Sequence, residues 1–187
     1  MYRAVLIGLV LACLVACDLK KEAPVGIQPQ NPSPMVDHIR AHQRIDPDTF
    51  KGIRFQIPDI LDTPFEVFVP DRESDIGFKN IWFHFHGADY IVQAGIENAN
   101  EPVIGIGLHL GAGSSVYERA FSDRNVFPVV LEALFEKCQI YGVPLHPDRH
   151  VFISSFSAGY GAIRSILSYH SEEIHGVLLL DGLHTDY

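Results

Sequence analysis

Apolar residues along the chain gather in short runs that alternate with segments of helical periodicity. The runs are rich in Val, Ile, Leu and Phe, which favours strands that are buried on both faces. We predict strands at 55–58, 65–70, 80–86, 102–110, 150–154 and 176–180, and helices at 88–99, 123–140 and 162–169. Strands that alternate with helices predict an α/β fold, with a mostly parallel central sheet flanked by helices on both faces.

The first residues have the pattern of an export signal, which we assign to 1–16. Arg3 supplies a positive charge, and the apolar run at 4–16 is shorter than the ~20 residues needed to span a bilayer. The run ends in Leu-Val-Ala followed by Cys17, which resembles the lipobox of bacterial lipoproteins. The resemblance implies that Cys17 is lipidated and anchors the exported protein to a bacterial membrane, on the periplasmic or cell-surface side. The alternative is a plain secretory signal that contains a cysteine.

Residues 17–34 form a predicted tether. This segment holds four prolines and no aromatic residue, so it cannot bury enough apolar surface to fold. The predicted domain follows at 35–187. A short helix is expected at its start, and we interpret His38 and His42 there as solvated surface residues rather than metal ligands.

Composition narrows the classes of partner. The net charge of −9 argues against nucleic acid, because phosphate binding requires a basic surface. Of the three cysteines, Cys13 lies in the predicted leader, which leaves no disulfide framework. Cys138 continues a helical apolar pattern and is predicted to be a small core residue.

The stretch from Phe152 to Ala162 carries the clearest chemical signal. A β-rich run enters a turn of small residues, and a helix-compatible run follows. Ser157 sits at the centre of the turn, with the small residues Ser155 and Gly159 two positions away on either side. This pattern predicts a nucleophile elbow, in which Ser155 replaces the first glycine of G-x-S-x-G. The alternative is a Ser/Gly-rich turn without chemistry.

Polar groups also end two other predicted strands, at His86-Gly87 and at Asp181. This order of motifs resembles the α/β-hydrolase superfamily over about residues 55–187, most closely its secreted esterase and feruloyl-esterase-like branches. The resemblance implies a small-molecule carboxylic ester as substrate, an acyl-enzyme on Ser157 and no cofactor. It also implies that the N–H groups of Ala158 and of Gly87 or Ala88 stabilise the oxyanion.

Two departures from that pattern matter. The His-Gly turn holds a single glycine, which leaves Gly87 and Ala88 as alternative oxyanion donors. Family members continue through further strands to a catalytic histidine, whereas this chain ends at Tyr187. Either the chain is a truncated member that lacks the usual base, in which case turnover should fall by several orders of magnitude, or a histidine already present serves as the base. His184 is the only late candidate for the base, and Asp181 is either the catalytic acid or a turn residue.

Two other functions compete with the serine hydrolase. His84 and His86 lie on one face of a predicted strand with Asp89 just beyond, a spacing that suggests a metal-dependent hydrolase. That alternative leaves the Ser157 turn unexplained, so the favoured interpretation includes no metal. The other alternative is a surface lipoprotein that uses the fold as a non-catalytic scaffold. The apolar strand at 177–180 is expected at an open sheet edge, where it would favour association.

Overall fold

The computed structural model describes residues 45–72 and 76–182. The predicted leader, the tether with Cys17, and the histidines His38, His42 and His184 lie outside the described residues. Within the described part of the chain, no helix is both long enough and apolar enough to cross a membrane.

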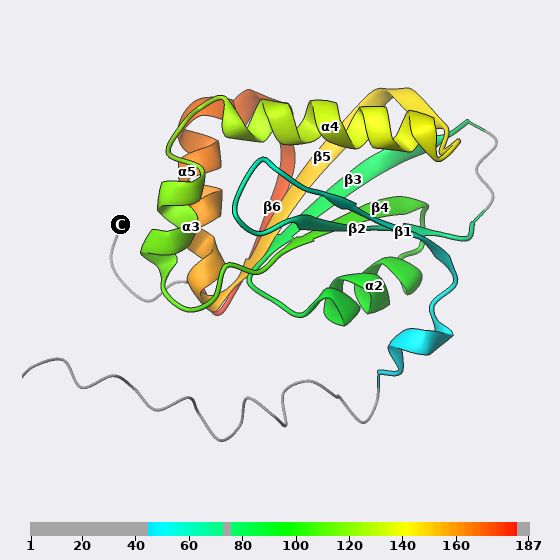
Figure 1. The fold of residues 1–187 in the computed structure, drawn as a ribbon, viewed down its shortest axis with the longest axis horizontal. Coiled ribbons are helices and arrows are strands. Elements are labelled where there is room, and N and C mark those ends of the chain that lie inside the picture. The colour runs from blue at the N-terminus through cyan, green and yellow to red at the C-terminus, as the bar shows by residue number, and fades with distance from the viewer. Residues whose placement is uncertain (1–44, 73–75, 183–187) are drawn as a thin grey trace, which may run out of the picture. The chain divides into compact units, whose positions relative to one another are not determined.

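A six-stranded mixed sheet forms the centre of the described region (Figure 1). Its strands are β1 (Gly52–Ile57), β2 (Phe65–Pro70), β3 (Phe78–Phe85), β4 (Val103–Leu108), β5 (Leu145–Phe156) and β6 (Ile174–Leu180). They lie in the order β1-β2-β4-β3-β5-β6. The pairs β1–β2 and β2–β4 are antiparallel, and every later pair is parallel. The predicted α/β class with a mostly parallel sheet is confirmed.

Helices cover the two faces of the sheet unequally. On one face lies α2 (Asp89–Glu97), and on the other lie α3 (Ser114–Ala120), α4 (Val126–Ile140) and α5 (Tyr160–His170) (Figure 1). The buried side chains separate in the same way. Val92 and Ile96 of α2 pack with Phe68 and Val103 in a small cluster. The larger cluster joins α3, α4 and α5 to the inward residues of the strands, which include Ile81, Phe83 and Phe85.

The periodic helix α4 shows how the apolar pattern directs packing. Phe127, Val130 and Leu134 recur at helical spacing, and all three are buried against the sheet. Cys138 continues this stripe and is fully buried, as predicted. Burial raises the pKa of its thiol to about 11, so the group stays neutral and unreactive at physiological pH.

Two elements differ from the sequence prediction. The strand predicted at 150–154 begins earlier, at Leu145, because Leu145 pairs with Phe78 of β3. The short helix α3 was not predicted at all. It carries few apolar residues, and its position depends on tertiary contacts. A Cβ placed on Gly161 of α5 would lie 2.1 Å from the carbonyl oxygen of Ser114, so only glycine allows α5 to approach α3 this closely.

Asp123 is the first residue of the helix predicted at 123–140, but in the structure it lies before α4, which starts at Val126. Its carboxylate accepts the N–H of Asn125 at 2.9 Å, while its carbonyl accepts the N–H of Val126 at 3.1 Å. Asn125 is the residue that precedes the first helical turn. The aspartate therefore shapes the turn that leads into α4.

Candidate active site

A sharp corner joins β5 to α5. The strand ends at Phe156, a 3₁₀ turn spans Ser157–Gly159, and α5 starts at Tyr160. Ser157 has a φ of 43°, in the left-handed region that residues other than glycine rarely adopt. Such backbone conformations store on the order of 1–3 kcal/mol and cluster at functional sites. The tight bend that the sequence suggested is present, with the serine at its apex.

Small residues on both sides allow this corner to form. A Cβ on Gly159 would lie 2.2 Å from the carbonyl oxygen of Phe85 and 3.0 Å from the Cβ of His86. Gly159 is thus the point at which the corner touches the end of β3. Ser155 is completely buried, and its hydroxyl finds no hydrogen-bond partner among the described residues. Ser155 thus meets the need for a small residue at this position, but its buried hydroxyl contributes no stabilising hydrogen bond among the described residues.

The Ser157 side chain is more exposed than that of Ser155. Ser157 is half-buried, and its hydroxyl makes no hydrogen bond to any described residue. The hydroxyl stands at the start of a 3₁₀ turn that continues into α5. The first N–H groups of a helix have no partner within it, and Ala158 contributes one of them. The corner therefore combines an uncommitted hydroxyl with backbone donors beside it.

The end of β3 supplies the second wall of the site. His86 has a φ of 68°, and its N–H donates to the carbonyl of Leu108 at 2.9 Å. Gly87 and Ala88 follow and lead into α2, with Ala88 extended as the residue before the first turn. Because Gly159 abuts the Phe85–His86 backbone, the structure brings both candidate oxyanion segments to the same edge of the sheet.

The ring of His86 is fixed by hydrogen bonds. Its Nδ1 lies 2.9 Å from the hydroxyl of Tyr117, and that hydroxyl accepts the N–H of Leu110 at 2.9 Å. The tyrosine hydroxyl thus links Nδ1 of His86 to the N–H of Leu110. A backbone hydrogen bond to Gly111 is also present. The His86 imidazole thus ties the end of β3 to the loop after β4.

Burial lowers the pKa of His86, and the neighbouring His109 lowers it further, while the Gly111 hydrogen bond opposes these effects. The neutral form is therefore the stable one in the folded protein. Burial also lowers the pKa of His84, with a second contribution from His86. Burial thus favours the neutral form of both imidazoles.

His84 is engaged as well. Its Nδ1 lies 2.8 Å from the Ser154 hydroxyl, and the Trp82 indole N–H donates to the same oxygen at 2.7 Å. Across residues 45–72 and 76–182, no group of three His, Cys, Asp or Glu side chains has the geometry to hold a metal ion. Asp89 heads α2, and burial raises the pKa of its carboxyl. The structure therefore does not assemble His84, His86 and Asp89 into the metal site considered as an alternative.

Sequence reasoning missed His109 and Tyr117. His109 directly follows β4, is exposed, and stacks on His86 with 5.1 Å between ring centroids. A polar residue just beyond an apolar strand is the signal that identified His86 and Asp181, and it applies to His109 too. Tyr117 is fully buried in α3, and without that helix no sequence signal places it near His86.

Asp181 follows β6 directly and is exposed, with a φ of 52°. His86, Ser157 and Asp181 thus follow three adjacent parallel strands, β3, β5 and β6, and each has a left-handed backbone. Loops at the carboxyl ends of parallel strands are where α/β proteins place their chemistry. The structure brings the predicted polar residues to this edge, whereas His184 lies outside the described residues.

No family model matches the chain, and no curated protein matches it. Among solved structures, acylaminoacyl peptidase from Pyrococcus horikoshii is similar at 16% identity and a TM-score of 0.45, over 71% of this chain and 23% of that protein. A thermostable esterase is similar at 18% identity and a TM-score of 0.41, over 70% of this chain and 40% of that one.

A feruloyl esterase module from Clostridium thermocellum, solved with sinapinate, is similar at 12% identity and a TM-score of 0.29. That likeness covers 80% of this chain and 85% of the module. The chain spans less than half the length of the peptidase and of the thermostable esterase. At these values the likenesses do not assign the chain to a family, and the fold class rests on the strands and helices themselves.

Proposed function

We propose that the chain is a serine hydrolase of carboxylic esters that forms an acyl-enzyme on Ser157. One observation carries this proposal. Ser157 occupies a strained corner between a strand and a helix, and its hydroxyl is uncommitted among the described residues. A turn without chemistry gains nothing from holding a non-glycine residue in this conformation. A nucleophile gains access to its substrate and a backbone donor beside it.

In the proposed reaction, the Ser157 oxygen attacks the ester carbonyl and its proton passes to a base. The tetrahedral intermediate carries a negative oxygen, for which we propose the N–H groups of Ala158 and of Gly87 or Ala88 as donors. Each such donor is worth roughly 3–4 kcal/mol in the transition state. The bond to the alcohol then breaks, and water hydrolyses the acyl-enzyme in a second step of the same kind.

The proposed reaction requires a base that accepts the Ser157 proton. The His86 ring is engaged by Tyr117 and Gly111, and Nδ1 of the His84 ring lies against the Ser154 hydroxyl. We therefore assign neither histidine as the base. We retain His184 as the one late candidate for the base and Asp181 as a candidate acid. If His184 does not serve, turnover falls by several orders of magnitude while the serine stays accessible. The variant His184→Ala distinguishes these cases, because it lowers turnover only if His184 is the base.

A paired inhibition experiment tests the proposed class of enzyme. A fluorophosphonate is expected to modify the folded chain, and EDTA is expected to leave hydrolysis of p-nitrophenyl acetate unchanged. The Ser157→Ala variant should lose both labelling and hydrolysis while its circular dichroism spectrum is unchanged. Hydrolysis that stops with EDTA would favour metal chemistry. Wild-type protein that neither labels nor hydrolyses esters would favour the non-catalytic scaffold.

We also propose that the protein is exported and held at a bacterial membrane by a lipid on Cys17. The support is the leader pattern and the residues around Cys17. Several acyl chains hold such a protein stably at a membrane without a spanning helix. Metabolic labelling with a fatty-acid analogue should mark the wild-type chain, and Cys17→Ser should abolish the label. A membrane-free, unlabelled wild-type protein would contradict the anchor.

A further inference from the structure

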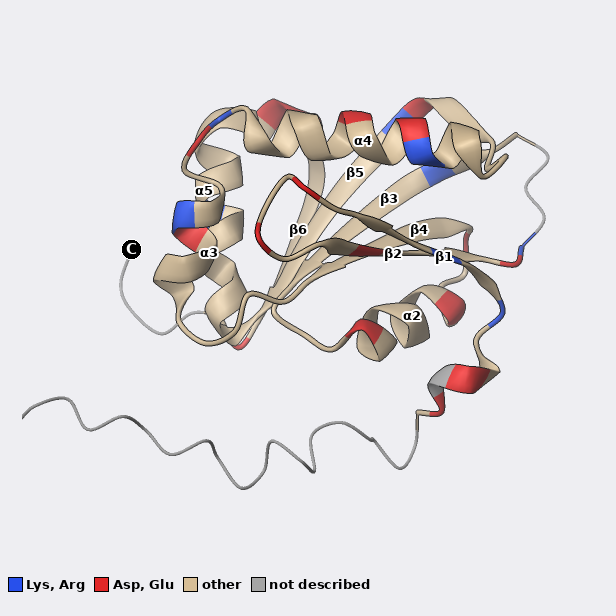
Figure 2. Ribbon diagram, in the orientation of Figure 1, with Lys and Arg blue, Asp and Glu red and all other residues tan. Residues whose placement is uncertain are grey.

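The two edges of the sheet have different chemical character. On edge strand β1, the exposed residues include Arg54 and Gln56, and the guanidinium of Arg54 hydrogen-bonds to Gln93 of α2. On the opposite edge, β6 holds no Lys, Arg, Asp or Glu (Figure 2). Charged residues are the usual protection of an edge strand against pairing with another chain. The edge at β6 lacks that protection.

The four last residues of β6 are apolar and exposed. The exposed fractions are 45% for Val177, 44% for Leu178, 39% for Leu179 and 45% for Leu180. Because successive side chains of a strand point to opposite faces, residues 177–180 are partly exposed on both faces of the sheet. Within the described residues β6 pairs only with β5, from Ile174 opposite Val151 to Leu180 opposite Phe156. The outer N–H and C=O groups of β6 therefore have no strand partner among the described residues.

We propose that β6 pairs antiparallel with β6 of a second copy of this chain, across a two-fold axis at Leu178. A two-fold axis through the sheet makes two identical strands run antiparallel. The strand suits such self-pairing because it carries no like charges that would repel each other across the axis. The two six-stranded sheets then join into one.

The position of the axis follows from the polar residues that flank the apolar core of β6. With Leu178 opposite itself, Val177 faces Leu179. His175 then comes level with Asp181 of the second copy, which is the first residue beyond β6 and has a left-handed backbone. An axis at Val177 instead places His175 opposite Leu179, and an axis at Leu179 places Asp181 opposite Val177. Only the axis at Leu178 matches a hydrogen-bond donor with a carboxylate, on both sides of the axis at once.

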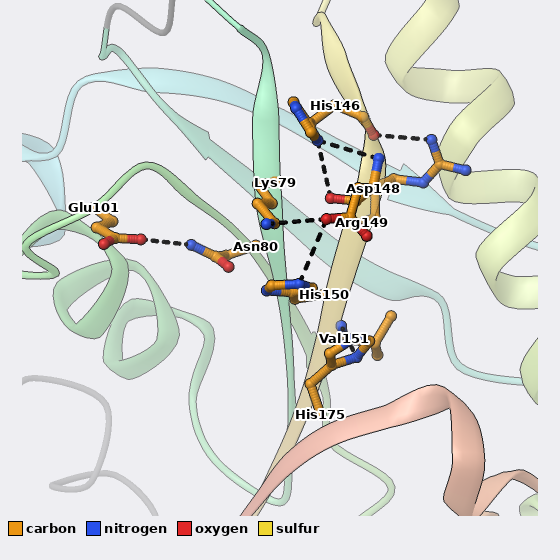
Figure 3. Close-up of polar contacts among 9 residues, drawn as sticks. All are labelled: Lys79, Asn80, Glu101, His146, Asp148, Arg149, His150, Val151 and His175. Atoms are coloured by element: carbon orange, nitrogen blue, oxygen red, sulfur yellow. Dashed lines mark hydrogen bonds and ion pairs between the residues drawn. The ribbon is translucent and has the colours of Figure 1, made fainter.

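The neighbours of His175 orient its ring for a hydrogen bond to Asp181 of the second copy. The Val151 N–H donates to His175 Nδ1 at 3.3 Å, and the His175 ring stacks on His150 with 4.3 Å between centroids (Figure 3). Since Nδ1 accepts, the neutral ring carries its proton on Nε2. His175 is exposed, and among the described residues no hydrogen bond is made by Nε2. This N–H is the donor that we assign to the Asp181 carboxylate of the second copy.

A cysteine scan tests the register. The full chain with Cys13 and Cys17 replaced by serine retains only Cys138, which is buried. Single cysteines are then placed at 177, 178 and 179 and oxidised. Directly opposite residues lie within disulfide reach, at about 5 Å, whereas residues offset by two positions are about 7–8 Å apart. Leu178→Cys should therefore cross-link at least tenfold faster than the other two. Equal rates, or no cross-link at 178, would overturn the proposed axis.

Sedimentation tests the interface itself. The wild-type chain should show a monomer–dimer equilibrium, and Leu178→Lys should shift it to monomer at all concentrations. Association driven by the apolar leader would not respond to Leu178→Lys, and that result would overturn the proposal. His175→Asp should weaken the dimer at least threefold, and adding Asp181→His should restore it. A wild-type monomer with slow amide exchange in β6 would show that another segment covers the strand, and would also overturn the proposal.

Discussion

His86 and Ser157 follow neighbouring parallel strands, and both have a left-handed backbone. They differ in whether the side chain makes hydrogen bonds. His86 is held by Tyr117 and Gly111, and its backbone N–H by Leu108. The Ser157 corner is held instead by the close approach of Gly159 to β3, and its hydroxyl makes no hydrogen bond among the described residues. The left-handed backbone at His86 is held through its own side chain, which is thereby used for structure. The left-handed backbone at Ser157 is held by the packing of neighbouring residues, so the serine hydroxyl stays available for reaction.

The largest expected effect comes from Gly159→Ala, which breaks the Ser157 corner. The new methyl group would overlap the Phe85 carbonyl, which is backbone and cannot move aside. We expect a loss of about 3 kcal/mol or more in the free energy of unfolding, and no fluorophosphonate labelling. Urea denaturation and gel fluorescence measure the two effects.

Gly95→Ala is the matched control for that variant. Gly95 lies within α2, and no atom lies within 4 Å of a Cβ placed there. This change should stabilise the protein by up to about 1 kcal/mol, because alanine favours helices, and labelling should be unaffected. Equal behaviour of the two alanine variants would contradict the role assigned to Gly159.

Tyr117→Phe breaks the His86 corner and should have the next largest effect. It leaves the Leu110 N–H and the His86 Nδ1 without their shared partner. We expect a loss of about 1–3 kcal/mol in the free energy of unfolding, and labelling of Ser157 slowed roughly tenfold as the end of β3 loosens. Tyr141→Phe is the control. That tyrosine stacks on Phe55, and its hydroxyl has no hydrogen bond to the described residues, so neither value should change.

Ser155→Ala sharpens the comparison between the two serines of the corner. The buried Ser155 hydroxyl is unsatisfied among the described residues, so removing it should raise the free energy of unfolding by about 1 kcal/mol. Labelling of Ser157 should remain. A destabilised variant would show that the hydroxyl has a partner after all.

The smallest effect concerns pH. Folding lowers the pKa of His86 below its ordinary value of 6.5, so the unfolded chain binds the proton more readily. This contribution to stability is present above pH 6.5 and is lost as the pH falls through the lowered pKa. His86→Asn keeps a residue that tolerates positive φ and cannot titrate. Its urea midpoint should fall less steeply than that of the wild type between pH 7 and 5. Parallel curves would contradict the lowered pKa.

The sequence was sufficient for the strands and for the Ser157 corner, because apolar runs and the spacing of Ser155, Ser157 and Gly159 are local signals. It did not reveal α3 or the early start of β5, which depend on contacts with α5 and β3. The network around Tyr117 could not be predicted for the same reason. Its two hydrogen bonds join residues from three elements that are separate in the sequence.

The nucleophilic role of Ser157 is tested most directly by mapping where a fluorophosphonate reacts. Tryptic cleavage releases the peptide 150–164, which holds Ser154, Ser155 and Ser157, and fragmentation of that peptide assigns the adduct to a single residue. We predict an adduct on Ser157 in the folded wild-type chain, and none after denaturation or in Ser157→Ala. An adduct on another serine, or an unmodified Ser157 after prolonged exposure of the folded chain, would contradict the account.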